Sequence, residues 1–114
     1  MDILIRPETE KDWFQTEVIT KKAFWNLHRP GCDEHYLVHL LRSDPSYLSE
    51  ISRVAEYNGI VIATIMYSEA RVVGINGTET PVITFGPLCV DPEFQRKGVG
   101  GVLLNETLQL AREA

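Results

Sequence analysis

The sequence lacks a basic cluster, a long apolar run and a cysteine framework, and each absence excludes a class of protein. Its 114 residues carry 11 basic and 16 acidic side chains, for a formal net charge of -5, whereas nucleic-acid-binding domains usually carry a basic face. No stretch approaches the roughly 18 consecutive apolar residues of a membrane span. The first ten residues lack the basic start and apolar core of a secretory signal. We therefore expect a soluble, cytoplasmic protein with neither a nucleic-acid partner nor a membrane partner.

The only two cysteines, Cys32 and Cys89, lie too far apart in the sequence to suggest a disulfide framework. Cys32 begins a Cys-x-x-His-x-x-x-His pattern with His35 and His39, a spacing that metal sites also use. A closed zinc site needs about four ligands, and the sequence offers no second Cys/His cluster. We therefore expect no metal, and a polar helix face at these positions. Cys89 has no histidine near it in sequence, which predicts a buried apolar cysteine and not a nucleophile.

The spacing of apolar residues and turn residues predicts the element order β-α-α-β-β-β-α. The predicted elements are a strand at residues 3–5, a helix from residue 9, a helix at 33–41, strands at 53–57, 60–67 and 81–90, and a helix at 100–112. Asn58-Gly59 predicts a two-residue hairpin, because both residues tolerate positive φ. The strand after it is apolar on both faces and should be central and covered. Gly86-Pro87 predicts a bulge or a strand edge, because proline cannot donate to a ladder.

Helical spacing also predicts which side chains reach the core. In the first helix the expected core residues are Trp13, Phe14, Val18, Phe24 and Trp25. In the last helix the expected apolar stripe is Leu104, Leu108 and Ala111. No internal repeat, low-complexity segment or linker interrupts the chain, so we expect one domain spanning residues 1–114.

The most informative stretch runs from Leu88 to Leu104 and reads as a strand, a tight loop and the start of a helix. Its glycines let the loop backbone approach a ligand without Cβ clashes. Loop N–H groups and the positive end of the helix dipole favour an anion, and Arg96 and Lys97 add positive charge. The stretch predicts a cradle for a phosphate or pyrophosphate. The alternative is an ordinary turn in which glycine only allows close packing.

Two common nucleotide patterns do not fit this loop. A P-loop requires Gly-x-x-x-x-Gly-Lys-Ser/Thr, but Lys97 precedes the first glycine and no serine or threonine follows. A dinucleotide fingerprint requires a third glycine where this sequence has Leu103, and an acidic residue about 20 positions further on. The sequence given ends before that position.

The loop pattern Gln95-x-x-Gly98-x-Gly100 instead resembles the GNAT superfamily of N-acetyltransferases, whose signature is Gln/Arg-x-x-Gly-x-Gly/Ala. The Val-Asp-Pro-Glu-Phe-Gln segment that leads into the loop, the Leu-Leu pair in the following helix and the element order are similar to the family as well. The resemblance covers essentially all of the chain. It implies an α/β (α+β) fold of GNAT type with a mixed sheet.

The resemblance also implies a reaction, in which an amine attacks the thioester of acetyl-CoA directly. The backbone from Gln95 to Gly101 would hold the pyrophosphate, and main-chain groups of Leu88 and Val90 would pair with the pantetheine amides as a pseudo-strand. An N–H near Cys89 or Val90 would stabilise the oxyanion. The implied cofactor-binding residues are Leu88, Cys89, Val90, Gln95, Arg96, Lys97, Gly98, Val99, Gly100 and Gly101.

The sequence departs from the family at two points. Family members usually continue past this helix with a strand that forms the second wall of the cofactor cleft, so we expect a chain that is truncated at the C-terminus. The strand edge left exposed predicts association with another chain, such as a homo-oligomer. Residues 82–90 also contain no acid or histidine, so no catalytic residue is assigned. Glu69 or Glu79 acting through water is one option, and a solvated charge at each position is the simpler one.

The acceptor amine is not specified by the sequence. In the resembled family the first two helices border the acceptor site, so His28, His35 and Tyr36 are candidate substrate contacts. Two other functions remain open at this point. One is a non-catalytic acyl-CoA-binding or regulatory module, and the other is a nucleotide-binding interaction domain.

Overall fold

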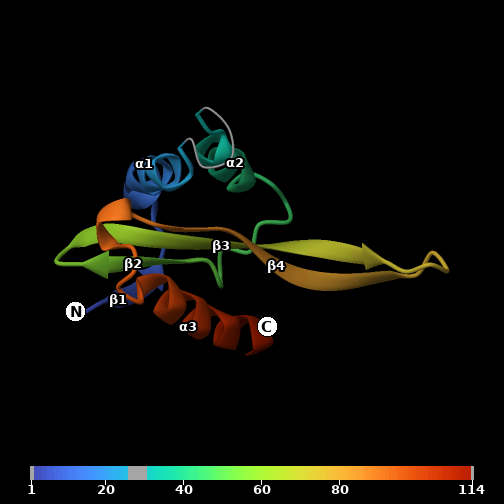
Figure 1. Cartoon of the computed structure of the whole chain (residues 1–114). Coiled ribbons are helices and arrows are strands. Elements are labelled where there is room, and N and C mark those ends of the chain that lie inside the picture. The colour runs from blue at the N-terminus through green and yellow to red at the C-terminus, as the bar shows by residue number, and fades with distance from the viewer. Residues whose placement is uncertain (1, 26–30, 114) are drawn as a thin grey trace.

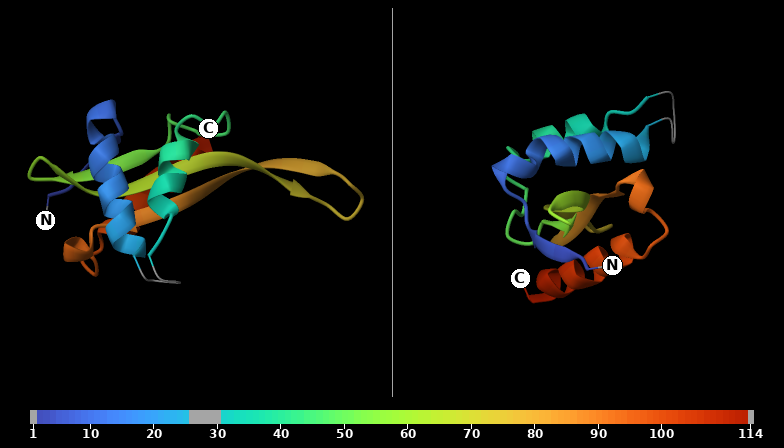
Figure 2. Two further views of the ribbon diagram at one scale, coloured as in Figure 1. Left: turned by 90° about the horizontal axis from the view of Figure 1, so that it is seen from above. Right: turned by 90° about the vertical axis from the view of Figure 1, so that its left-hand side faces the viewer.

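The computed structural model describes residues 2–25 and 31–113. Its elements are β1 (Leu4–Pro7), the 3₁₀ helix η1 (Glu10–Asp12), α1 (Trp13–Phe24), α2 (Glu34–Leu41), β2 (Arg53–Tyr57), β3 (Ile60–Val73), β4 (Glu79–Val90), the 3₁₀ helix η2 (Pro92–Phe94) and α3 (Val99–Glu113). The helices form two layers around a sheet, with α1 and α2 over one face and α3 over the other (Figures 1 and 2). The predicted element order and fold class are confirmed.

The four described strands lie in the order β1-β2-β3-β4, and all three pairs are antiparallel. Asn58 and Gly59 connect β2 to β3 with positive φ angles of 51° and 77°. Positive φ at both central positions characterises the two-residue hairpin turn that matches strand twist. The predicted hairpin is therefore confirmed.

The bulge predicted at Gly86-Pro87 is also present. The register between β3 and β4 shifts between Ile65 and Tyr67. Met66 of β3 therefore stands opposite both Gly86 and Pro87 of β4, which is the two-against-one arrangement of a β-bulge. The bulge divides β4 into a part that projects from the molecule and a part that ends beside α3.

Beyond the bulge, β3 and β4 continue as a two-stranded arm that projects from the rest of the molecule (Figure 1). The molecule measures 49 × 36 × 27 Å along its principal axes. Both strands are longer than predicted, since β3 reaches Val73 and β4 begins at Glu79. Much of the arm's apolar surface is exposed, including Val72, Val73, Ile75, Ile83 and Phe85.

The sheet separates two apolar clusters. The cluster on the α3 side contains Ile62, Ile65, Tyr67, Val99 and Leu103 among its buried members. The cluster on the α1 side is formed by Ile19, Val54, Val61 and Cys89. Cys89 is buried, as predicted.

The predicted core face of α1 is wrong except at Phe24, which is half-buried and packs against the α1-side cluster. The fully buried residues of this helix are Thr16, Ile19 and Thr20, whereas Phe14 is 79% exposed and Trp25 is 52% exposed. Small and β-branched side chains on the buried face allow the helix to lie close to the sheet. The other predicted core residues are exposed or half-buried, namely Trp13, Val18 and Phe24.

The predicted stripe of α3 is displaced by one helical position. The fully buried line is Val99, Leu103 and Thr107. The predicted residues Leu104, Leu108 and Ala111 are half-buried beside it. The helix begins at Val99, one residue before the predicted start.

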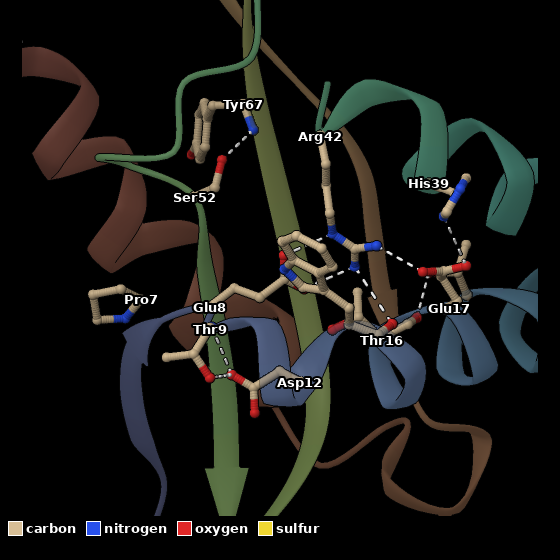
Figure 3. A network of polar contacts seen from close by, with 12 residues as sticks. Pro7, Glu8, Thr9, Asp12, Thr16, Glu17, His39, Arg42, Ser52 and Tyr67 are labelled. Atoms are coloured by element: carbon tan, nitrogen blue, oxygen red, sulfur yellow. Dashed lines mark hydrogen bonds and ion pairs between the residues drawn. The ribbon is translucent and has the colours of Figure 1, made fainter. Parts of the chain in front are cut away.

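A buried ionic cluster joins the β1–α1 connection, α1 and the residue after α2 (Figure 3). Arg42 donates from Nε and Nη2 to the two carboxylate oxygens of Glu8, at 3.0 Å each, and from Nη1 to Glu17 Oε2 at 2.7 Å. The side chains of Arg42 and Glu8 are only 6% and 7% exposed. The guanidinium also lies 5.2 Å from the ring centre of Trp13. This cluster fixes the N-terminal half of α1 against the end of α2.

Candidate functional site

The candidate site begins at the last residues of β4, at the edge of the sheet. The N–H of Asp91 donates to Ile62 O at 2.8 Å. In an antiparallel pair this bond places Val90 at a non-hydrogen-bonded position, so its own N–H and C=O point away from β3. Leu88 has the same orientation by alternation, and Cys89 between them turns its main chain toward β3. Two residues therefore present main-chain groups at an edge that no other described strand covers.

The chain leaves β4 through a loop that its own side chains organise. Asp91 is buried, and its Oδ1 accepts the N–H of Glu93 at 3.1 Å, which caps η2. Gln95 then turns back, and its Nε2 donates to Val90 O at 3.0 Å. The Gln95 amide thus occupies one of the main-chain acceptors at the sheet edge, which shows that an amide N–H fits there.

The following residues direct the chain into α3. Arg96 and Gly98 both have positive φ, at 65° and 82°, a conformation that glycine adopts without cost. The first N–H groups of any helix lack an acceptor within it, and the first bond back in α3 runs from Val102 N to Gly98 O at 3.1 Å. With the side chains of Arg96 and Lys97 exposed beside it, this turn can bind an anion.

A hollow of ≈ 370 Å³ lies where β4, the loop and α1 meet, and we refer to it as the edge hollow. Its lining residues are Ala23, Phe24, Leu88, Cys89, Val90, Gln95 and Gly100. A Cβ on Gly100 would lie 3.4 Å from Val90 Cγ2, so the first turn of α3 packs closely on the end of β4. The structure thus gathers five of the predicted cofactor-binding residues around one space.

The remaining predicted cofactor-binding residues do not line the edge hollow. Arg96, Lys97, Gly98 and Gly101 are exposed on the loop and the start of α3, and the side chain of Val99 is buried in the core. Any contact from Val99 is therefore restricted to its main chain. A larger hollow of ≈ 570 Å³ lies between the arm and α3 and contains none of the predicted cofactor-binding residues.

Cys89 is unsuited to act as a nucleophile. Burial raises the pKa of its thiol to about 11, against a smaller opposite effect of a hydrogen bond with Thr20. The thiolate is the reactive form of cysteine, and at neutral pH this thiol is protonated. Its role in the site is to fill the α1 side of the sheet.

The two glutamates considered as bases both lie on the arm. Glu69 pairs with Ile83, and Glu79 pairs with Val73 near the tip. Leu88, the lining residue nearest the arm, pairs with Ile65, so Glu69 lies four residues, or about 13 Å, from the edge hollow along β3. Glu79 lies nine residues from Leu88 along β4, or about 30 Å. Neither reaches the edge hollow.

Another polar pair lies where α1 and α2 meet. Cys32 Sγ is 3.7 Å from His35 Nδ1 and 3.5 Å from the main-chain oxygen of Lys21. The main-chain oxygen that Cys32 contacts is in the last turn of α1, and Ala23 and Phe24 of the same turn line the edge hollow. This pair therefore lies at the end of α1 that borders the site.

The last histidine of the metal-like pattern and the other candidate substrate contacts lie elsewhere. His39 Nδ1 is 3.6 Å from Glu17 Oε1 and its ring stacks with Tyr36, so it faces the ionic cluster and not Cys32 (Figure 3). Tyr36 is exposed, and His28 lies outside the described residues. Within residues 2–25 and 31–113, no group of three or more His, Cys, Asp or Glu side chains is arranged to hold a metal ion.

The α1 wall of the edge hollow was not predicted from the sequence. Ala23 and Phe24 line it from the last turn of α1. The signal available in the sequence was small, since an alanine and a phenylalanine at a helix end are ordinary core residues.

No helix in the described part of the chain is long and apolar enough to cross a membrane.

Comparisons with known proteins bear on this geometry. Residues 5–114 match the sequence profile of the acetyltransferase (GNAT) family. A search of curated protein sequences gave no match. Among solved structures, the chain is similar to a GNAT family acetyltransferase from Brucella melitensis in complex with acetyl-CoA. The TM-score is 0.84 and the identity 30%, over 98% of this chain and 70% of that one.

Two further structures share the fold at lower identity. An aminoglycoside antibiotic 6'-N-acetyltransferase from Acinetobacter haemolyticus matches with a TM-score of 0.66 and 24% identity, over 96% of this chain and 72% of that one. A ribosomal-protein-S18-alanine N-acetyltransferase from Escherichia coli matches with a TM-score of 0.69 and 19% identity. That match covers 98% of this chain and 61% of the Escherichia coli chain.

Proposed function

The chain belongs to the GNAT acetyltransferase family, and from that premise we propose that it transfers the acetyl group of acetyl-CoA to a primary amine. The observation that carries the proposal is the outward-facing main chain of Leu88 and Val90, which lies beside the edge hollow and the loop that leads into α3. An edge strand followed by an anion-binding turn suits a ligand with amides at one end and a diphosphate at the other.

We place the two parts of acetyl-CoA as follows. The pantetheine runs along the β4 edge, where its amides pair with the main chain of Leu88 and Val90. One of its N–H groups replaces the side chain of Gln95 on Val90 O, because that oxygen already accepts an amide N–H at 3.0 Å. The pyrophosphate lies against the backbone from Gln95 to Gly101, at the positive end of α3.

The reaction we propose is a direct transfer. The neutral amine attacks the thioester carbonyl, a tetrahedral oxyanion forms, and the coenzyme A thiolate departs. The outward main-chain N–H of Val90 would donate to that oxyanion, which is the position where a donor lowers the barrier most. The N–H of Cys89, the other candidate from the sequence, points toward β3 and is not available. The amine must also lose a proton to a base. We leave that base unassigned.

We further propose that residues 1–114 act as a single domain in the cytoplasm. The free edge of β4 and the exposed apolar residues of the arm favour a partner strand, such as one from a second copy of the chain. The acceptor is a small molecule or a peptide that carries an amine.

Titration calorimetry with acetyl-CoA tests the binding half of the proposal. A carboxylate introduced by Gly98→Asp would face the two phosphates of the ligand, and we expect it to weaken binding by at least about tenfold. Gly98→Asn has nearly the same size and shares the αL conformation, so its binding should stay within about threefold of the wild type.

Gly77→Asp is the matched control for a charge placed at a glycine of positive φ. Gly77 has a φ of 79° against 82° for Gly98, and no atom lies within 4 Å of a Cβ at either position. Gly77 lies at the tip of the arm, so this variant should bind acetyl-CoA like the wild type. Equal affinity in Gly98→Asp and the wild type would contradict the placement of the pyrophosphate.

A non-catalytic acyl-CoA-binding module is the second candidate. It is favoured by the lining of the edge hollow, which among the described residues contains no acid and no histidine. Release of coenzyme A in the presence of a panel of amines distinguishes the two. Amine-dependent release supports the transferase, and saturable binding without release supports the binding module.

A further inference from the structure

Cys32 differs from Cys89 in its exposure and in its polar neighbours. Its side chain is partly exposed, and His35 Nδ1 lies 3.7 Å from its sulfur. Cys89 is 1% exposed, and burial raises the pKa of its thiol to about 11. A cysteine activated by a histidine within hydrogen-bonding reach is the arrangement that cysteine nucleophiles use.

The position of Cys32 links it to the proposed acetyl-CoA site. Its sulfur contacts the main-chain oxygen of Lys21 on α1. Ala23 and Phe24, which follow Lys21 by two and three residues, form the α1 wall of the edge hollow. The thiol and the edge hollow therefore lie at the same end of α1.

We propose that Cys32, with His35 as its base, is a second acetyl acceptor in this protein. The inference rests on the proposed function, because acetyl-CoA must occupy the edge hollow for the thiol to meet its thioester. The product is an acetyl thioester on Cys32, formed without any redox change. It makes Cys32 a self-acetylation site that competes with the amine for the same acetyl group.

The proposed step is a thioester exchange in which atoms and electrons balance. The thiol proton passes from Cys32 to Nδ1 of His35, and the sulfur attacks the thioester carbonyl. The bond between that carbonyl carbon and the coenzyme A sulfur then breaks, and the departing thiolate takes the proton from His35. The thiol proton has two acceptors within reach, Lys21 O and His35 Nδ1. Of these two, only the imidazole nitrogen is a base that can accept the proton and later return it.

The test uses the full chain with acetyl-CoA, followed by intact-mass measurement and peptide mapping. We expect one acetyl group on Cys32, and its removal by hydroxylamine, which cleaves thioesters. Cys32→Ser should abolish this label, and peptide mapping should find no acetyl group on Cys89. His35→Gln should slow labelling by about 100-fold, the contribution typical of a general base.

His39→Gln is the matched control, because His39 is on the same helix but contacts Glu17 and not the thiol. It should label at the rate of the wild type. Labelling of Cys89, or equal rates for His35→Gln and His39→Gln, would overturn the assignment of the pair. Alkylation of Cys32 by iodoacetamide gives a second readout. If His35 is only structural, His35→Gln should leave the alkylation rate unchanged. If His35 is the base, His35→Gln should lower that rate.

A second acetyl donor separates this inference from the proposed function. S-acetyl-N-acetylcysteamine carries an acetyl thioester without a nucleotide and therefore does not need the phosphate cradle. If it labels Cys32 and acetyl-CoA neither binds nor labels, the Cys32–His35 pair is supported and the proposed function fails. If calorimetry shows that acetyl-CoA binds while neither donor labels Cys32, the inference fails and the proposed function stands.

Discussion

Replacing Arg42 with methionine should destabilise the fold by about 3–5 kcal/mol, the typical cost of leaving one member of a buried ion pair without its partner. Methionine keeps most of the length of the side chain and removes the charge. The group left behind is Glu8, whose side chain is 7% exposed. Within the described residues, both hydrogen bonds that this carboxylate accepts come from Arg42, at 3.0 Å.

The magnitude depends mainly on Glu8 and less on the other members of the cluster. Glu17 also loses a bond of 2.7 Å, but its side chain is 28% exposed and can be solvated. A loss of about 3–5 kcal/mol corresponds to a fall in melting temperature of about 12–20 °C for a chain of this size. Loss of the packing between Arg42 and the ring of Trp13 adds to the effect.

Urea unfolding followed by circular dichroism measures the change in the free energy of unfolding. Arg71→Met is the control, since Arg71 is exposed on the arm and should change stability by less than about 0.5 kcal/mol. The double variant Glu8→Leu/Arg42→Met removes both charges and should regain most of the loss. A loss of under about 1 kcal/mol in the free energy of unfolding for Arg42→Met would refute this account. A loss in the double variant equal to the sum of the losses in Glu8→Leu and Arg42→Met would also refute it.

Two further predictions concern buried polar groups. Hydrogen bonds from Arg6 lower the pKa of Asp12 from 3.8 to about 2, so folding favours the charged form. Asp12 should therefore stabilise the fold by at most about 2 kcal/mol above pH 4, and this contribution is lost as the pH falls toward 2. When the free energy of unfolding is measured against pH, Asp12→Asn should remove the part of the acid-side slope that Asp12 contributes. The same slope in the variant and the wild type would contradict this prediction. The hydroxyls of Tyr67 and Thr107 lie 2.8 Å apart, and Thr107 also donates to Leu103 O. Tyr67→Phe should cost about 1 kcal/mol, and Thr107→Val more, up to about 3, because it leaves a buried phenol unpaired. The reverse order in urea unfolding would exclude this arrangement.

The turns of the sheet could be predicted because their chemistry is local. Asn58-Gly59 is a hairpin turn because two adjacent residues tolerate positive φ, and Gly86-Pro87 is a bulge because proline lacks an N–H for the ladder. The glycine-bearing loop from Gln95 to Gly101 follows the same logic. Each of these features depends on neighbours in sequence, and no tertiary contact overrides them.

The buried face of α1 could not be predicted because it depends on how closely the helix approaches the sheet. Size and hydrophobicity favoured Phe14 and Trp25, but the contact surface over β3 and β4 accommodates Thr16 and Thr20 instead. The hydroxyl of Thr20 bonds to its own helix, at Thr16 O, which lets a polar residue be buried there. Trp25 stays outside beside Lys21.

Residues that act through distant partners gave no signal in the sequence. Arg42 is an ordinary basic residue at a helix end until Glu8, 34 positions earlier, is placed beside it. In the sequence, Cys32 and His35 stand out as a metal-like spacing, and His35 as a candidate substrate contact. Their relation to β4 depends on how α1 and α2 pack. The lengths of β3 and β4 were also underestimated, since the arm carries exposed apolar residues without a clear alternation.

Helix α1 has a different kind of attachment at each of its ends. The ionic cluster around Arg42 holds the half that contains Glu17, and Ala23 and Phe24 at the other end form a wall of the edge hollow. Twelve residues make the helix about 18 Å long, so a tilt of about 5° at one end moves the other by about 1.5 Å. If the helix moves as a rigid body, loosening its contacts with Arg42 at one end displaces Ala23 and Phe24 at the other. Displacements of about 1 Å at a reacting centre can reduce rates about a hundredfold. Substitutions at Arg42 should therefore change the proposed acetyl transfer without touching the substrate.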